Sequence, residues 1–401
     1  MPEQIFKNKT YRNDIAQFVY YVIGYGATLI LSYGLNVLLN RSLAPDELGL
    51  FSYVQGLINI LAPIFCLTFY NAYLRFHKDH TLSRGMLRMG LPFYLFSAAA
   101  CAVVIAVVTR SVIPLLYAVF VFFTERQYIL RVQMQIWKLN LLRVMELLVP
   151  CLFLGVLYLL KVEVKASWVL LFYGIGFCTA FLFSPKSRLN EEEVSRKNLF
   201  QYLFPIMGTS FLTFALLNVG VLFAKNYFGL SGAAEWGVAF RATGIYKSFT
   251  SLFLIFFPMI YFREAAKNNY RIITIYRTSI ILFAVLMLLP FVLLPGLVYR
   301  LLGAARYEEG SMLLVFLACG DFCNFVFSLF GLFFNFEIKA WKNTIFKGIE
   351  LVLFLAGAFV FARGSLMVMG GVYLAATAFP FVAMLCLSLS QEISFFTKRK
   401  V

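Results

Sequence analysis

A succession of apolar segments, each about as long as a bilayer is thick, constrains this chain more than any other feature. About 20 apolar residues cross a bilayer as a helix, and such segments follow one another from residue 17 to residue 390. Of the 401 residues, 61% are hydrophobic and 13% are charged. A soluble protein of this length could not bury so much apolar surface. The sequence therefore predicts an all-α integral membrane protein.

The hydrophobic pattern predicts about twelve transmembrane helices. Their expected ranges are 17–39, 48–69, 89–108, 112–132, 141–160, 166–184, 199–224, 236–262, 278–298, 312–336, 346–362 and 365–390. Short connections separate them, so we expect neighbouring helices to run antiparallel.

The basic residues indicate the orientation of these helices. The net charge is +16, from 35 Lys and Arg against 19 Asp and Glu, and most of the basic residues fall in alternate connections. Because cytoplasmic loops carry the excess of Lys and Arg, both termini are expected in the cytoplasm. The same residues would meet anionic lipid of the inner leaflet. This distribution argues against nucleic acid as a partner.

A hydrophilic segment near the middle, "SPKSRLNEEEVSRKN" at 184–198, predicts a linker between two six-helix lobes, 1–190 and 191–401. A weak internal repeat supports this division. "ELGLFSYVQGLIN" at 47–59 aligns with "EWGVAFRATGIYK" at 235–247 at an offset of 188 residues, with Glu, Gly and Gly identical. Since each lobe would hold an even number of helices, we expect parallel repeats.

Two cations lie inside the predicted eighth helix, Arg241 and Lys247. With Gly244 and Ser251 they recur at three- and four-residue spacing, which forms one polar stripe on an apolar helix. Cations at this depth face the bundle interior or a water-filled cavity. The alternatives are pairing with a neighbouring carboxylate or, for Arg241, an outward reach to the interface.

The repeat places amides opposite these cations, because Gln55 and Asn59 correspond to Thr243 and Lys247. If the lobes face each other across a cavity, one wall presents amides and the other presents cations, which would suit an anionic ligand rich in hydroxyl groups. Asn36 and Asn40, near the outer end of the first helix, with Arg41 after them, would add to the amide wall. For each asparagine, a hydrogen bond between helices is an equal alternative.

Acidic residues are rarer inside the predicted helices. Glu146 and Glu350 are placed in the first turns of the fifth and eleventh helices, where the helix dipole favours a carboxylate and a structural role. Asp321, early in the tenth helix, has three alternatives: it neutralises Arg241 or Lys247, it binds a coupling ion, or it meets the helix dipole.

The sequence lacks the features of a membrane enzyme. The outer connections are short, no carboxylates are paired at a spacing suited to acid–base chemistry, and there is no phosphate-binding loop. We predict no catalytic residue, no metal and no cofactor. A channel would show rings of like residues or a filter loop, so the pattern favours a secondary transporter.

The segment "LLNRSLAPDELGLFSYVQGLINIL" at 38–61 carries a family resemblance. It resembles the first outer loop and second helix of polysaccharide flippases, the Wzx-type O-antigen transporters, in which Arg-x-Leu-x-Pro-x-Glu-[Phe/Tyr/Leu]-Gly follows the first helix. Five residues here fit that pattern: Arg41, Leu43, Pro45, Glu47 and Gly49. These flippases share a superfamily with the multidrug/toxic-compound (MATE) exporters and the lipid-linked peptidoglycan-precursor flippases.

The resemblance implies a V-shaped, MATE-like pair of six-helix lobes in the bacterial inner membrane. Such a protein flips an undecaprenyl-pyrophosphate-linked oligosaccharide from the inner to the outer leaflet for lipopolysaccharide or other surface polysaccharide biosynthesis. The implied energy source is a proton gradient, a sodium gradient or the membrane potential. Other polysaccharide assembly proteins are implied as partners. The alternatives are a drug or organic-cation exporter of the same superfamily and a membrane scaffold that transports nothing.

Overall fold

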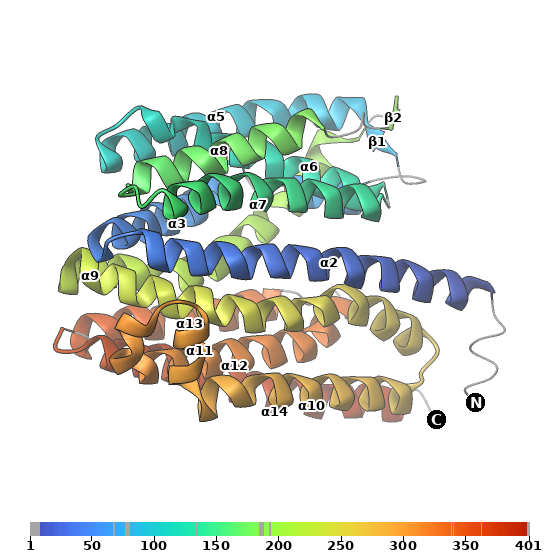
Figure 1. Cartoon of the computed structure of the whole chain (residues 1–401). Coiled ribbons are helices and arrows are strands. Elements are labelled where there is room, and N and C mark those ends of the chain that lie inside the picture. Colours follow the sequence, from blue (N-terminus) through green and yellow to red (C-terminus); the bar gives the residue numbers. More distant parts are fainter. Residues whose placement is uncertain are drawn as a thin grey trace. The chain divides into compact units, whose positions relative to one another are not determined.

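The structure is a computed structural model that describes residues 9–66, 69–76, 81–133, 135–183, 188–191, 194–337, 339, 341–361 and 363–398. Within these ranges the chain is almost entirely helical, as the sequence predicts, and its helices run roughly along one another within each of two compact units (Figure 1). Unit 1 comprises residues 1–47 and 57–207, and unit 2 comprises residues 48–56 and 208–401.

Unit 1 is a helical bundle with a two-residue parallel strand pair at one end, Leu82↔Leu189 and Ser83↔Asn190. Ser83 caps α5, since its hydroxyl accepts a hydrogen bond from the amide of Met86. Its elements are α2 (Lys9–Ser42), most of α3 (Pro45–Phe65), α4 (Tyr70–Phe76), β1 (Leu82–Ser83), α5 (Arg84–Thr109), the 3₁₀ segment η1 (Ile113–Val119), α6 (Phe120–Val132), α7 (Ile136–Leu159), α8 (Ala166–Leu182) and β2 (Leu189–Asn190).

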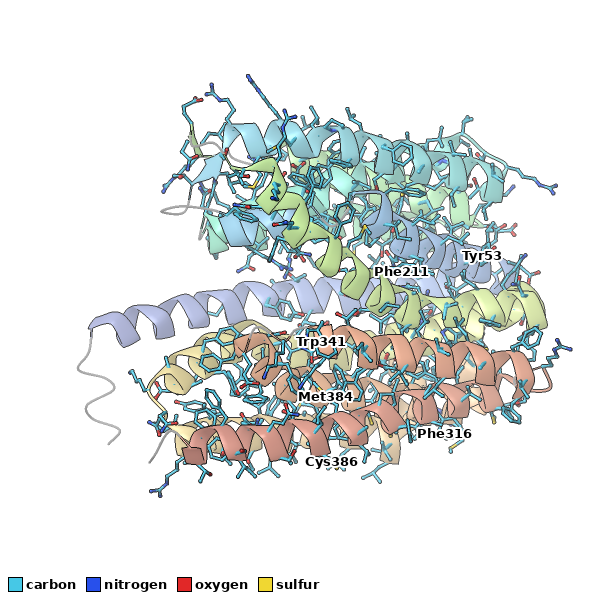
Figure 2. All side chains as sticks on the ribbon, turned by 180° about the vertical axis from the view of Figure 1, so that it is seen from behind. Tyr53, Phe211, Phe316, Trp341, Met384 and Cys386 are labelled. Carbon is cyan, nitrogen blue, oxygen red and sulfur yellow. The ribbon has the colours of Figure 1, made fainter. Side chains whose placement is uncertain are left out.

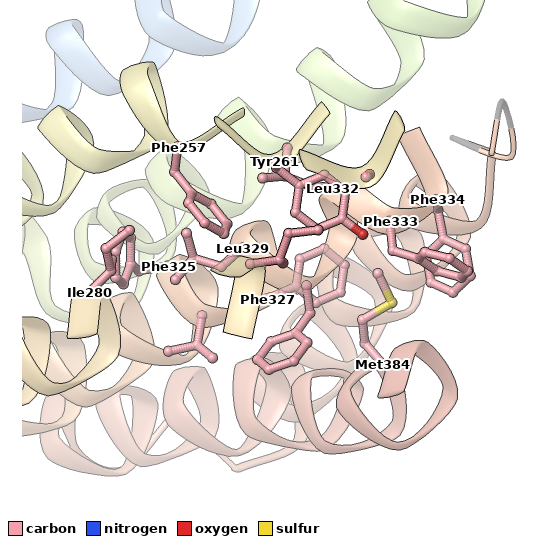
Figure 3. Packing of buried hydrophobic residues seen from close by; sticks show 14 of the residues in the cluster. Phe257, Tyr261, Ile280, Phe325, Phe327, Leu329, Leu332, Phe333, Phe334 and Met384 are labelled. Atoms are coloured by element: carbon pink, nitrogen blue, oxygen red, sulfur yellow. The ribbon is translucent and has the colours of Figure 1, made fainter. Parts of the chain in front are cut away.

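Unit 2 contains the rest of the helices, with α12 at its centre because α10, α13 and α14 all pack against it. Its elements are most of α9 (Arg196–Ala266), α10 (Tyr270–Leu293), α11 (Pro295–Leu301), the 3₁₀ segment η2 (Ala305–Gly310), α12 (Ser311–Phe336), α13 (Trp341–Phe361) and α14 (Leu366–Lys398). Aromatic side chains from α9 and α12, among them Phe257, Tyr261 and Phe333, form much of its core with Met384 of α14 (Figure 3).

The long helix α9 is two helices joined at Gly229, whose backbone angles, φ 72° and ψ −165°, are not helical. Ten helices in the described ranges are long and apolar enough to cross a membrane, one of them being the joined segment 210–254. Counting its two halves separately and adding the shorter apolar helix α8 gives the predicted twelve segments. The chain is a multi-pass membrane protein.

Several predicted boundaries are wrong. The expected connection at 225–235 is helical except at Gly229. The fifth and eleventh membrane helices, α7 and α13, each begin five residues before the predicted starts at 141 and 346. Glu146 and Glu350 therefore lie in the third turn of their helices rather than in the first, out of reach of the helix N-terminus. Of the predicted linker, 188–191 and 194–198 are described; β2 and the start of α9 lie there.

Candidate functional site

The polar stripe predicted on the eighth membrane helix lies in the second half of α9, well inside the segment 210–254 that is apolar enough to cross a membrane. The two serines that follow Lys247 bond within their own helix: Ser248 donates to the carbonyl of Gly244, and Ser251 donates to the carbonyl of Ser248. What the stripe offers to its surroundings is therefore chiefly the charge of Arg241 and Lys247.

Lys247 forms an ion pair with Asp321 of α12, with 3.1 Å between Nζ and Oδ2. The lysine side chain is 27% exposed, whereas the aspartate side chain is 3% exposed. The ammonium group also lies 3.6 Å from the centre of the Phe240 ring, in a cation–π position. The ammonium nitrogen and the paired carboxylate oxygen are both buried, so the exposed part of the lysine is its aliphatic stem.

Asp321 belongs to a longer polar network inside unit 2. The Tyr373 hydroxyl on α14 donates to Asp321 Oδ1 at 3.2 Å, and Asn324, one turn along α12, donates to that hydroxyl at 3.5 Å. Lys347 on α13 donates to the side-chain amide oxygen of Asn324 and to Glu350 Oε2, the latter at 2.7 Å. Four helices of unit 2 therefore share one chain of polar contacts.

Arg241 lies one and a half turns before Lys247 and contacts a different helix. Its Nη1 donates to the Ser52 hydroxyl at 2.8 Å, and its guanidinium lies 6.0 Å from the centre of the Phe51 ring. Both partners belong to the 48–56 segment of α3, which is part of unit 2. The close approach needs a small residue, because a Cβ at Gly237 would collide with Ser52.

The other predicted site residues are not joined to these cations by the contacts described above. Asn36 of α2 donates to the carbonyl of Ser32 on its own helix at 2.9 Å. Arg41 is exposed in the last turn of α2. Gln55 and Asn59 are half-buried on α3, with Gln55 in unit 2 and Asn59 in unit 1. Their roles stay predictions.

Known structures share this architecture. An inward-facing multidrug resistance MATE family transporter of the MOP superfamily superposes with a TM-score of 0.66 at 16% identity, over 96% of this chain and all of that chain. An outward-facing multidrug resistance MATE transporter gives 0.63 at 13% identity over 98% of each chain. The lipid II flippase MurJ, in an inward closed conformation, gives 0.65 at 12% identity over 95% of this chain and 89% of that one.

The chain has the fold of these transporters. No family model matches the sequence, and no curated protein matches it either. At these identities the likeness concerns the fold, and it confirms the predicted all-α, MATE-like class.

Within this MATE-like fold, the motif at 41–49 has structural roles. Leu43 pairs through its backbone with Val164, and Pro45 is the first residue of α3. The Glu47 carboxylate accepts a hydrogen bond of 2.7 Å from the amide of Ala166, the first residue of α8. A Cβ at Gly49 would collide with the backbone of Leu230. The spacing of the motif thus reflects how helix ends pack.

The sequence analysis missed two parts of the polar network. Lys347 and Glu350 have the i, i+3 spacing of a helical ion pair, which the sequence could have revealed once α13 was given its true start. Tyr373 gave no signal, because a tyrosine in an apolar helix is common and only the packing of α14 on α12 brings its hydroxyl to Asp321.

Proposed function

We propose that this chain is a secondary transporter that flips an undecaprenyl-pyrophosphate-linked oligosaccharide, an O-antigen or other surface polysaccharide unit, across the bacterial inner membrane by alternating access. Two observations support it: the fold is shared with a lipid II flippase, and two cations lie inside one membrane helix, Arg241 and Lys247. The motif at 41–49, which resembles that of Wzx-type flippases, points to the same substrate class.

The position of Lys247 carries this proposal. Its ammonium nitrogen and the Asp321 oxygen that it pairs with are both buried, and the aliphatic part of the lysine accounts for the 27% exposure of the side chain, so an anion would reach the charge once the pair opens. In a site of low dielectric, a cation attracts a pyrophosphate far more strongly than in water. Arg241 is the second cation on the same helix. Gln55, Asn59 and Asn36 would meet sugar hydroxyls, and Arg41 would meet the anion near the outer end of α2.

Asp321 gives the proposed transporter a means of coupling. While Asp321 is ionised, it neutralises Lys247 and competes with an incoming anion. If a proton or a sodium ion neutralises Asp321, the full charge of Lys247 becomes available to the pyrophosphate. Loss of that ion restores the pair and releases the substrate. A proton gradient, a sodium gradient or the membrane potential would then drive export.

Alanine variants of the two cations test the proposal. In cells that depend on this chain for surface glycan, Lys247→Ala and Arg241→Ala should each reduce export at least tenfold, the effect of losing about 1.4 kcal/mol of binding free energy. Lys225→Ala is the matched control, since Lys225 lies in the first half of α9 and packs on the Tyr53 ring. Normal export by correctly inserted Lys247→Ala would refute the role of Lys247.

A drug or organic-cation exporter is the second candidate, favoured by the multidrug MATE transporters of like fold and by the carboxylate of Asp321. An organic cation would displace Lys247 from Asp321, so the carboxylate would be essential and the lysine would compete. In that case Lys247→Ala should preserve or raise drug efflux, and Asp321→Asn should abolish it. The flippase proposal expects the lysine variant to be inactive.

A further inference from the structure

The fifth membrane helices of the two units carry the same ten-residue pattern. Trp137-Lys138 is followed by Arg143 and Glu146 in α7, and in α13 the corresponding residues are Trp341-Lys342, Lys347 and Glu350, all at one offset of 204 residues. Each helix thus has Trp-Lys in its first turn and places a cation and a glutamate three residues apart. Because helical residues three apart are neighbours, each pattern forms a potential ion pair.

The position of Trp-Lys in each helix indicates how deep the two pairs lie in the membrane. Trp137 is 66% exposed and Trp341 is 59% exposed, and Trp341 is labelled in Figure 2. Exposed tryptophan and lysine at a helix end are the side chains that gather at the membrane–water interface. Each glutamate follows its tryptophan by nine residues, which is about 13 Å at about 1.5 Å per residue. That is close to the midplane of a hydrocarbon core about 30 Å thick.

In unit 2 the lysine and the glutamate form an ion pair. Lys347 Nζ lies 2.7 Å from Glu350 Oε2, and the two side chains are 9% and 2% exposed. Lys347 also donates to Asn324 and lies 4.5 Å from the centre of the Phe327 ring. This carboxylate has its counter-charge in place.

In unit 1 the equivalent arginine and glutamate do not form an ion pair. Among the described residues, the Glu146 carboxylate forms no hydrogen bond or ion pair, and the charge that acts on it is that of Arg143, one turn earlier. The Arg143 guanidinium is instead 6.0 Å from the centre of the Tyr25 ring of α2. Both side chains are half-buried.

Glu146 does not face lipid. Leu142 and Pro150, one turn to either side on the same face, are buried, whereas Leu141 and Leu152 on another face are 43% and 59% exposed. A carboxylate inside a membrane helix, turned away from lipid and lacking a bonded partner, has to be neutralised by a ligand or bear a high cost in free energy.

Among the side chains that the structure describes, the neighbouring helices bring no other charge to Glu146. From α8 the nearest contact is Gly176, whose absent Cβ leaves room for the Glu146 carbonyl and Pro150. From α2 the titratable group described on this side is Tyr25, whose ring contacts Arg143. On α6, Glu125 accepts a hydrogen bond of 2.6 Å from Tyr73 of α4, and Tyr128 stacks on Tyr70 of α4. Burial and the charge of Arg143 therefore act together on how tightly Glu146 holds a proton.

We infer that Glu146 is a reversible proton-binding site at the middle of unit 1, and that Glu350 is its locked counterpart in unit 2. A proton taken up by Glu146 neutralises the carboxylate and leaves Arg143 as a net cation in the membrane interior; its release restores a zwitterionic pair. This inference rests on the proposed function, because a proton site serves a proton-coupled transporter. Its test measures protonation of Glu146 and not transport.

The test is labelling with dicyclohexylcarbodiimide, which adds to protonated carboxyl groups in apolar surroundings, followed by peptide mass spectrometry on the full chain in nanodiscs. Glu146 should be labelled at mildly acid pH and progressively less as the pH rises, while Glu350 should remain unlabelled throughout. Glu146→Gln should lose the adduct. Absence of label on Glu146 at every pH, or equal labelling of both glutamates, would overturn the inference.

Two variants test whether the paired cation controls protonation of each glutamate. Arg143→Gln removes the cation that favours the ionised form, so half-labelling of Glu146 should move to higher pH by about one unit or more. Lys347→Gln opens the pair in unit 2, and Glu350 should become reactive. If neither variant changes the labelling, the pairing state does not control protonation and the inference fails. If the chain labels as expected but exports no glycan, that result would contradict the proposed function and leave the inference about Glu146 standing.

Discussion

At the scale of single residues, two of the ion pairs described in unit 2 differ in how much of their side chains is exposed. Arg277 and Glu392 are 4% and 0% exposed, with 2.8 Å between Nη1 and Oε2. The second carboxylate oxygen accepts from the Tyr261 hydroxyl at 2.7 Å, and the guanidinium lies 4.2 Å from the centre of the Phe330 ring. This pair is closed on all sides and ties α9, α10 and α14 together. In the Lys247–Asp321 pair the charged atoms are buried as well, but the aliphatic part of the lysine is exposed.

The closed pair predicts a large effect on stability. Glu392→Gln leaves Arg277 as a buried cation without a counter-charge, which should lower the free energy of unfolding by about 3–5 kcal/mol. Glu337→Gln is the control, because Glu337 pairs with the half-exposed Lys339, and such a pair contributes about 0–1 kcal/mol. Unfolding in detergent measures both. Equal effects of the two substitutions on the free energy of unfolding would show that the Arg277–Glu392 pair is not buried in the folded protein.

At the scale of elements, the reversal inside α9 depends on Gly229. Its positive φ with extended ψ belongs to a region that essentially glycine alone adopts. A Cβ there would meet no atom within 4 Å, so the requirement is one of backbone conformation and not of space. The two halves of α9, which are the seventh and eighth membrane helices, can thus join without a loop.

Alanine at this position should be costly for that reason. Gly229→Ala should lower the free energy of unfolding by about 1–3 kcal/mol. Gly244→Ala, in the helical interior of the same element and equally without close neighbours, should instead raise it by about 0.5–1 kcal/mol. A thermal unfolding series in detergent compares the two, and a neutral Gly229→Ala would mean that the turn adopts other backbone angles.

Element boundaries were the part of the fold that the sequence predicted least well. Hydropathy locates the stretch that fits hydrocarbon, so it placed most membrane helices correctly but began α7 and α13 too late, at the end of their polar first turns. The shift mattered for function, since it assigned Glu146 and Glu350 to a helix N-terminus. The sequence predicts a connection at 225–235, yet the charged residues Lys225 and Glu235 both lie in α9.

At the scale of the whole molecule, the sequence predicted the class of fold, and the match to MATE transporters and MurJ confirms it. The repeat was only half visible from the sequence. The second helices match at an offset of 188 residues and the fifth at 204, because the segments between them differ in length, so one ungapped alignment could not find both. The Lys247–Asp321 contact was one of three alternatives for Asp321, since pairing between distant helices depends on packing.

The central claim is that Lys247 binds an anionic substrate in addition to pairing with Asp321. Exchanging the two, Lys247→Asp with Asp321→Lys, preserves the ion pair but puts a carboxylate on α9 where the cation was. The measurement is flipping of a pyrophosphate-linked oligosaccharide in vesicles reconstituted with this variant, beside its melting temperature. We expect a melting temperature close to that of the parent chain and flipping reduced at least tenfold. Flipping at the parent rate would show that the pair is structural and would contradict the account.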